Sequence, residues 1–132
     1  MKIIEENRDI LTVDDSEYYL VQFISADFAK STGIIKEYNK YNTKLNCILC
    51  DNRVFNLIIK KNYYQKPTYE SIKELFINMK KMLLDKDHMY EIKTNKIAIP
   101  NYSLYKLDWN KVQLIIEDVF KDTNVEILIC NK

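Results

Sequence analysis

The chain has 132 residues, of which 47% are hydrophobic, and its 20 lysine and arginine residues nearly balance its 19 aspartate and glutamate residues. This length predicts a single domain over residues 1–132 with about two-thirds of its unfolded surface buried, and the balanced charge argues against a protein that holds nucleic acid mainly through phosphate contacts. No stretch approaches the ~20 apolar residues of a membrane span, the first residues form no signal-peptide core, and the three cysteines form no disulfide framework, so we expect a cytoplasmic protein with no membrane partner.

Four apolar runs in the first half of the chain predict strands. The second run is the strongest, because it is rich in aromatic and branched side chains, which favour a pleated, half-buried surface. The last two runs flank Asp51-Asn52, a dipeptide typical of a tight hairpin turn. Between the second and third runs, a partial 3.6-residue apolar repeat predicts a helix over about 28–41. The expected strands cover residues 3–4, 18–24, 45–50 and 53–59.

Two further helices and two further strands are predicted in the second half. After Pro67, apolar residues recur at i, i+3, i+4 and i+7, and Asp108 is the expected N-cap of a last helix. Short apolar runs at 96–99, leading into Pro100, and at 125–130 predict strands. This alternation indicates an α/β fold with a mixed sheet and helices on both faces. The apolar stripe of the helix after Pro67 consists of Ile72, Leu75, Phe76, Met79, Met82 and Leu83.

The stretch from Val54 to Glu70 is the one around which the chain is organised. It begins with an apolar run, Val54 to Ile59, that delivers a lysine to the end of a buried strand. In open α/β sheets, ligands bind at the carboxyl ends of strands, so Lys60 is a candidate functional residue. The alternative is a charged strand end without a chemical role. A tyrosine-bearing loop follows, and Thr68, directly after Pro67, is a candidate N-cap of the next helix.

Three other features are weaker signals. Cys47 and Cys50 lie three residues apart in a predicted strand, so they point to opposite faces and cannot share a metal ion; we expect no metal site. His88, the only histidine, lies in a polar linker and is interpreted as a surface residue. Tyrosines in two loops could stack on a base or ribose, although an accident of composition is the favoured explanation. They are Tyr63, Tyr64, Tyr102 and Tyr105.

Two motifs and their surroundings resemble the macro domain family. They are Lys66-Pro67-Thr68-Tyr69-Glu70, within VFNLIIKKNYYQKPTYESIKELFINMKKM, and Leu107-Asp108-Trp109, within LDWNKVQLIIEDVFKDTNVEILIC. Weaker similarity in the first half covers Asn7–Leu11, Ile24–Phe28 and Gly33–Lys36. The resemblance therefore extends over nearly the whole chain. It is greatest to the branch that includes the terminal ADP-ribose protein glycohydrolase and its bacterial and phage relatives.

This resemblance implies a three-layer α/β/α fold that binds ADP-ribose, or an ADP-ribosylated protein, in a cleft at the strand ends without a cofactor. It implies that Lys60 corresponds to a lysine that attacks the ribose C1″ atom, which requires a partly neutral amine in a desolvated cleft. Asp9 matches a carboxylate that accepts from the adenine amino group, and the N–H of Ile10 follows it. The implied ligand-binding residues are Asp9, Ile10, Ser25, Ala26, Asp27, Ser31, Thr32, Gly33, Ile34, Asn101, Tyr102, Ser103, Leu104 and Tyr105.

Two loops depart from the family pattern. The first phosphate loop keeps Gly33, which is the only glycine of the chain, while Ser31 stands in place of another glycine. A Cβ atom there restricts close backbone approach to a diphosphate, although the hydroxyl of Ser31 or Thr32 can donate instead. The second loop is two residues shorter, and Tyr105 occupies the place of the catalytic aspartate. We therefore expect catalysis to be inefficient.

Three functions follow as hypotheses. The first is a non-catalytic macro domain, a pseudoenzyme, that binds ADP-ribose or a related nucleotide. The second is a divergent hydrolase that acts on ADP-ribosylated glutamate or O-acyl-ADP-ribose through Lys60, with Tyr105, Asp27 or a water molecule completing the mechanism. The third is a protein-interaction module that has lost the nucleotide and uses its tyrosine-rich loops against a partner.

Overall fold

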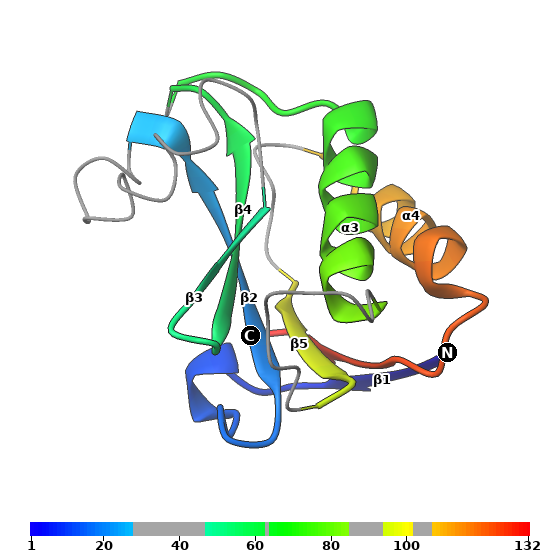
Figure 1. Cartoon of the computed structure of the whole chain (residues 1–132). Helices are drawn as coiled ribbons and strands as arrows, with labels where there is room; N and C mark the ends of the chain where they lie inside the picture. The colour runs from blue at the N-terminus through cyan, green and yellow to red at the C-terminus, as the bar shows by residue number, and fades with distance from the viewer. Residues whose placement is uncertain (28–46, 63, 85–93, 102–106) are drawn as a thin grey trace.

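The computed structural model describes residues 1–27, 47–62, 64–84, 94–101 and 107–132. The helix expected over 28–41 lies outside these ranges. The described residues include six strands that form one mixed sheet, shown in Figure 1. The strands are β1 (Lys2–Glu6), β2 (Tyr19–Ser25), β3 (Cys47–Cys50), β4 (Val54–Lys60), β5 (Lys96–Pro100) and β6 (Glu126–Cys130).

The sheet has the strand order β1-β6-β5-β2-β4-β3. All neighbouring pairs are parallel except β3 with β4, which are antiparallel. The carboxyl ends of five strands therefore lie along one edge of the sheet, which we call the carboxyl edge. The strand positions expected from the sequence are confirmed, and β5 also includes Pro100, which suits the last position of a strand because proline has no N–H to donate.

A two-residue turn joins β3 to β4 where the sequence predicted a hairpin. The N–H of Arg53 donates to the carbonyl of Cys50 at 3.0 Å. Between them, Asp51 has φ 54° and Asn52 has φ 52°. Positive φ at both central residues defines a type I′ turn, whose twist matches that of the strands, and Asn and Asp tolerate this conformation better than most residues. The side-chain oxygen of Asn52 also accepts from the Tyr19 hydroxyl at 3.2 Å.

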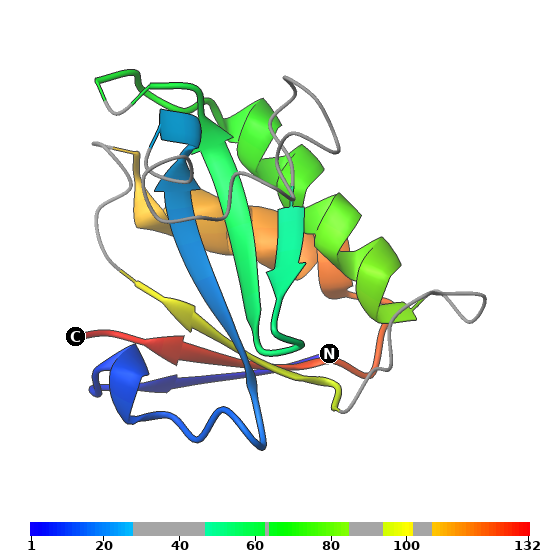
Figure 2. The same cartoon turned by 60° about the vertical axis from the view of Figure 1, so that its left-hand side comes forward.

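Two helices, α3 (Tyr69–Leu84) and α4 (Trp109–Phe120), lie together over one face of the sheet (Figure 2). Phe76 of α3 packs edge-on against Phe23 of β2 and against Phe120 of α4, with ring centroids 6.2 and 6.5 Å apart. Asp108 is the N-cap of α4, as predicted, and accepts from the N–H of Asn110 at 3.0 Å. The buried stripe of α3 consists of Ile72, Leu75, Phe76, Met79 and Leu83.

On the opposite face, a short 3-10 helix, η1 (Ile10–Thr12), packs through Ile10 against residues of β5 and β6. Val13, which follows it, packs against Ala98, Leu128 and Cys130. The predicted separation of the two other cysteines is confirmed, because Cys47 belongs to the core beneath α3, whereas Cys50 packs against the cluster on the other face. Within the described ranges, no helix has an apolar stretch long enough to cross a bilayer.

Candidate functional site

The parallel strands gather candidate residues from four distant parts of the chain at the carboxyl edge. Asp9 lies just beyond β1, Ser25–Asp27 end and follow β2, Asn101 follows β5, and Lys60 ends β4. In the strand order these elements run from β1 at one side of the sheet to β4 near the other. The described candidate residues therefore share one edge, as expected for a ligand site of an open α/β sheet.

Asp9 is held in an exposed turn that follows β1. Its Oδ1 atom accepts from the N–H of Leu11 at 2.9 Å and so caps η1. Arg8 fixes the same turn by donating to the Thr12 hydroxyl at 3.0 Å and to the Thr12 carbonyl at 2.7 Å. Ile10 is half-buried and packs beneath the turn. The backbone is thus anchored on both sides of an accessible carboxylate.

Two asparagines join three neighbouring strands beyond their last residues. The N–H of Asn101 donates to the Cys130 carbonyl at 2.7 Å, and the side-chain amide of Asn101 donates to Asn131 Oδ1 at 2.7 Å. The N–H of Asn131 donates to the Glu6 carbonyl at 2.9 Å. These bonds tie the ends of β1, β6 and β5 together, so the start of the loop after β5 is fixed relative to the turn that carries Asp9.

Lys60 lies beside the end of β2 because of an irregularity in the pairing. Ile24 pairs with Ile58, whereas Ser25 pairs with Lys60, so β4 contributes one additional residue at this point. Such bulges redirect side chains and occur often near functional sites. The Lys60 residue is only 3% exposed.

The residues at the end of β2 are held by hydrogen bonds beside Lys60. The hydroxyl of Ser25 donates to Asp27 Oδ1, and the N–H of Asp27 donates to the Lys61 carbonyl at 3.2 Å. Ser25 and Ala26 are each 4% exposed, and Asp27 is half-buried. A hydroxyl, a carboxylate and a buried lysine therefore stand on two adjacent strand ends.

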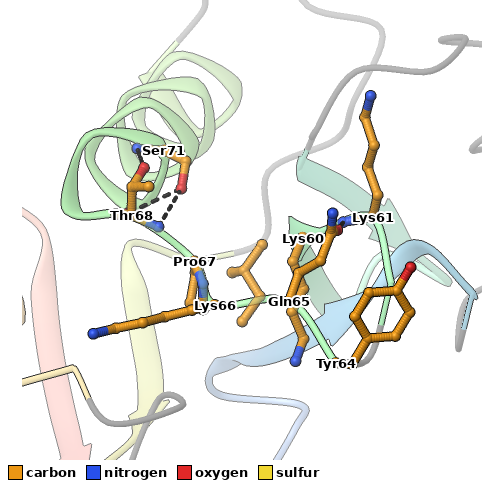
Figure 3. Close-up of a pocket in the computed structure, with 9 residues that line it drawn as sticks. Lys60, Lys61, Tyr64, Gln65, Lys66, Pro67, Thr68 and Ser71 are labelled. Atoms are coloured by element: carbon orange, nitrogen blue, oxygen red, sulfur yellow. Dashed lines mark hydrogen bonds between the residues drawn. The ribbon is translucent and has the colours of Figure 1, made fainter.

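A cavity of about 630 Å³ opens where β4 leads into α3. Residues 59–61, 64–68 and 71 line it, and we call it the basic pocket because three of these residues are lysines (Figure 3). Its volume falls within the roughly 300–1,000 Å³ of small-molecule sites. The buried Lys60 reaches this pocket from the strand, while Lys61 and Lys66 are exposed on the loop. The predicted lysine at the strand end is thus part of a larger basic cavity.

The start of α3 forms one wall of the basic pocket. Thr68 Oγ1 accepts from the N–H of Ser71 at 3.1 Å, and Ser71 Oγ accepts from the N–H of Thr68 at 3.3 Å. This reciprocal pair is a capping box, and it confirms the prediction that Thr68 caps the helix. Figure 3 shows each of the two side chains bonded to the backbone of the other residue at the first turn.

Sequence reasoning identified part of this arrangement and missed part of it. It did not include Lys61, Tyr64, Gln65 and Lys66 among the site residues, although the lysine- and tyrosine-bearing loop directly after the candidate strand was a usable signal. The described part of the site unites Asp9, Ile10, Ser25–Asp27, Lys60 and Asn101 at one edge. The remaining candidates lie outside the described residues: Ser31, Thr32, Gly33, Ile34, Tyr102, Ser103, Leu104 and Tyr105, as do Tyr63 and His88.

Burial raises the pKa of two cysteine thiols near this edge. Burial raises the pKa of the Cys47 thiol strongly above its ordinary value. Burial also raises the pKa of Cys130, which the charge of Arg8 lowers and the charges of Glu6 and Asp9 raise. Among the described residues, no group of three His, Cys, Asp or Glu side chains is placed to hold a metal ion.

Comparison with known proteins gives relatives in sequence and in structure, although no family model matches the chain. The ADP-ribose glycohydrolase OARD1 of Bos taurus is 30% identical over 110 residues, which are 80% of this chain and 70% of the relative. The macrodomain of Mycobacterium tuberculosis DarG superposes with a TM-score of 0.76 at 15% identity, covering 98% of this chain and 97% of that chain. The macrodomain of Thermus aquaticus DarG gives a TM-score of 0.70 at 15% identity, with 98% of both chains covered. The structural neighbours establish the fold, and the sequence relative establishes the family.

Proposed function

This chain belongs to the macro domain family and is related to ADP-ribose glycohydrolases, and from this premise we propose that it binds ADP-ribose or a related nucleotide without efficient catalysis. The family and the α/β fold agree with the resemblance seen in the sequence. The observation that carries the proposal is the shared location of Asp9, Asn101, Ser25–Asp27 and Lys60 along the carboxyl edge. A ligand that spans this edge meets an acceptor at one end and a cation at the other.

The adenine base is proposed to lie at Asp9. One carboxylate oxygen caps η1, and a carboxylate offers about four acceptor positions in total, so acceptor capacity remains for an exocyclic amino group. The bonds from Arg8 to Thr12 hold the turn in place before a ligand binds, which lowers the entropic cost of binding.

The distal ribose is proposed to lie at Lys60, and the diphosphate between the two ends. Asn101 and Ser25–Asp27 stand between Asp9 and Lys60 in the order of the strands. Their backbone bonds to neighbouring strand ends fix the points from which the two phosphate loops start. The pseudoenzyme proposal is supported by Tyr105, which occupies the place of an aspartate in the family pattern.

Calorimetric titration with ADP-ribose tests the binding proposal. Asp9→Asn should weaken binding by about 10-fold or more, because hydrogen bonds to charged groups contribute about 1.5–3 kcal/mol. Asp14→Asn is a matched control, since Asp14 Oδ1 accepts from the N–H of Ser16 at 2.9 Å, two residues ahead, as Asp9 does from Leu11. No heat at millimolar ADP-ribose, or an equal loss in both variants, would contradict the proposal.

A slow ADP-ribosyl hydrolase is the second candidate, and the burial of Lys60 beside Ser25 and Asp27 favours it. In this mechanism the Lys60 amine bonds to the ribose C1″ atom while the bond from C1″ to the substrate carboxylate breaks. Water, deprotonated by Asp27, then displaces the lysine and releases ADP-ribose. Loss of one supporting acid or base typically costs 10²–10⁴-fold in rate, so a slow enzyme is consistent with the replacement by Tyr105.

Release of ADP-ribose from an ADP-ribosylated glutamate peptide distinguishes the two candidates. A hydrolase should lose activity in Lys60→Met and keep it in Lys81→Met, because Lys81 is an exposed lysine of α3 that does not line the pocket. Equal rates in the wild type and Lys60→Met would exclude the lysine mechanism. Tight binding without release would leave the non-catalytic macro domain as the function.

A further inference from the structure

We propose that the basic pocket binds carboxylate side chains that flank the ADP-ribosylated residue of a protein substrate. This inference rests on the proposed function, because it assigns a second contact to a substrate whose ADP-ribose occupies the carboxyl edge. It concerns Lys61, Lys66 and the loop that holds them, which lie beyond the residues assigned to the nucleotide.

The position of the pocket supports this assignment. The proposed ligand runs from Asp9, beyond β1, to Lys60, at the end of β4, and the basic pocket continues from Lys60 toward α3. A protein joined to the distal ribose leaves the nucleotide at Lys60. The residues next to the modified side chain are therefore the part of the substrate closest to the pocket.

The charge of the pocket favours an anionic occupant. Its nine lining residues include three lysines and no aspartate or glutamate. Within the described part of the chain, neither Lys61 nor Lys66 takes part in an ion pair, whereas Lys2, Lys73, Lys96 and Lys121 all do. Lys61 and Lys66 are both exposed on the loop, so the carboxylates of a bound segment would offset their positive charge.

The loop that carries these lysines is held in place by Gln65. Its Oε1 atom accepts from the N–H of Lys61 at 3.1 Å and from the N–H of Asn62 at 2.9 Å. The N–H of Gln65 donates back to the Asn62 carbonyl at 3.1 Å. The capping box already satisfies the N–H of Thr68 and Ser71 at the start of α3, so the lysines supply the attraction for an anion.

The directions of the lysines favour an extended acidic segment over one compact anion. Figure 3 shows the side chains of Lys61 and Lys66 leaving the loop in different directions. They therefore suit carboxylates spaced along a peptide better than the oxygens of one phosphate. A nucleic acid fits less well, because the net charge of the chain is only +1.

The test compares two peptides that carry ADP-ribose through the same stable linkage, one with glutamates and one with glutamines at the flanking positions. The wild type should bind the acidic peptide about 3- to 10-fold more tightly at low salt, and the preference should fade at 0.5 M salt. A Lys61→Ala/Lys66→Ala variant should lose the preference and keep its affinity for free ADP-ribose. The control Lys81→Ala/Lys132→Ala removes the same charge outside the pocket and should keep the preference.

The outcomes separate this inference from the proposed function. Equal affinity of the wild type for both peptides, with binding of free ADP-ribose intact, overturns the pocket assignment alone. Failure to bind free ADP-ribose overturns the proposed function and the pocket assignment with it. An unmodified single-stranded oligonucleotide that competes at the pocket more strongly than an unmodified acidic peptide also overturns the choice of a protein segment.

Discussion

The two edges of the sheet use charge in different ways. At the amino ends of the strands, charges are paired: Lys96 contacts Glu17 at 3.1 Å and Glu126 at 4.0 Å, and Lys2 contacts Glu126 at 3.9 Å. At the carboxyl edge, Lys60 is buried, and Lys61 lies in a cavity whose described lining residues include no carboxylate. The same residue types therefore form a solvated ion-pair network at one edge and a candidate anion site at the other.

This contrast shows why lysine content alone identifies no site. We call the edge formed by the amino ends of the parallel strands the amino edge. Surface ion pairs between flexible side chains contribute about 0–1 kcal/mol, so the amino edge gains little stability from its charges. Lys61 and Lys66 take part in no ion pair within the described residues, so a role in binding explains their position better than a role in stability. The following predictions assign stability to the amino edge and binding to the carboxyl edge.

The largest expected effect is at an aromatic core residue near the amino edge. Phe55 is fully buried near the start of β4 and packs edge-on against Tyr19 with ring centroids 5.0 Å apart. Phe55→Ala should lower the free energy of unfolding by about 3–5 kcal/mol in urea denaturation, because it removes buried contacts and leaves a cavity. The affinity of the remaining folded protein for ADP-ribose should stay within about threefold of the wild type, since the site lies at the other end of the strand.

An exposed aromatic at the carboxyl edge provides the matched control. Tyr64 is 73% exposed and lines the basic pocket, so Tyr64→Ala should change the free energy of unfolding by less than about 0.5 kcal/mol. Comparable destabilisation by the two substitutions would remove the distinction between a stabilising edge and a binding edge.

The next effect concerns alkaline pH and Cys47. Burial raises the pKa of its thiol above the ordinary value of 9.0, so the folded state holds its proton more tightly than the unfolded state. This contribution to stability is complete below pH 9 and is lost as the pH rises toward the folded-state pKa. The unfolding free energy should fall by about 1.4 kcal/mol per pH unit above 9 from this group, and Cys47→Ala should remove that slope. Identical slopes of unfolding free energy against pH in the wild type and in Cys47→Ala would show that the Cys47 thiol is not buried from solvent.

A smaller effect is expected at Gln65. Gln65→Ala removes the acceptor of two N–H groups in an exposed loop, so the unfolding free energy should fall by about 1 kcal/mol. It should also reduce the preference for the acidic peptide, because Lys61 is no longer held. Gln113→Ala is the control, since it removes the acceptor for the Trp109 indole N–H at 3.2 Å, away from the pocket. Loss of the preference in both variants would indicate a general rather than a local effect.

Local patterns were sufficient to predict the strands and α-helices that the structure describes, but not the 3-10 helix η1. The periodicity after Pro67 predicted α3, Asp108 was recognised as a cap, and Asp51-Asn52 as a turn, because each depends on neighbours within a few residues. The topology follows a similar logic, since apolar strands that alternate with helices form parallel pairs.

The site was only partly predictable, because its form depends on contacts between distant segments. The sequence placed Lys60 at the end of a strand, but the bulge that sets it opposite Ser25 arises from the pairing of β2 with β4. The basic pocket depends on the backbone at Lys61 and Asn62, which the side chain of Gln65 stabilises. No local sequence pattern predicts that Gln65 acts as such an acceptor, because glutamine is common on loops that form no pocket.

The smallest expected effect is at the ion pair of the amino edge. Glu17 accepts a hydrogen bond from Lys96, and this bond, followed by the charge of Glu17, raises the pKa of Lys96 above its ordinary 10.5. The contribution of the pair is complete below pH 10.5 and is lost as the pH rises through the raised value. Glu17→Gln should therefore lower the denaturation midpoint slightly at neutral pH and low salt, flatten the decline above pH 10.5, and have no effect in 0.5 M salt.

The control for this ion pair is Glu5→Gln, which makes the same charge change at an exposed position of β1. Neither variant should alter ADP-ribose affinity, because Glu17 lies at the amino edge and Glu5 takes part in no ion pair within the described residues. An affinity loss in Glu17→Gln alone would show that the two edges are coupled through the strands. In that case the amino-edge charges would have a role in binding, and the division between the edges would be wrong.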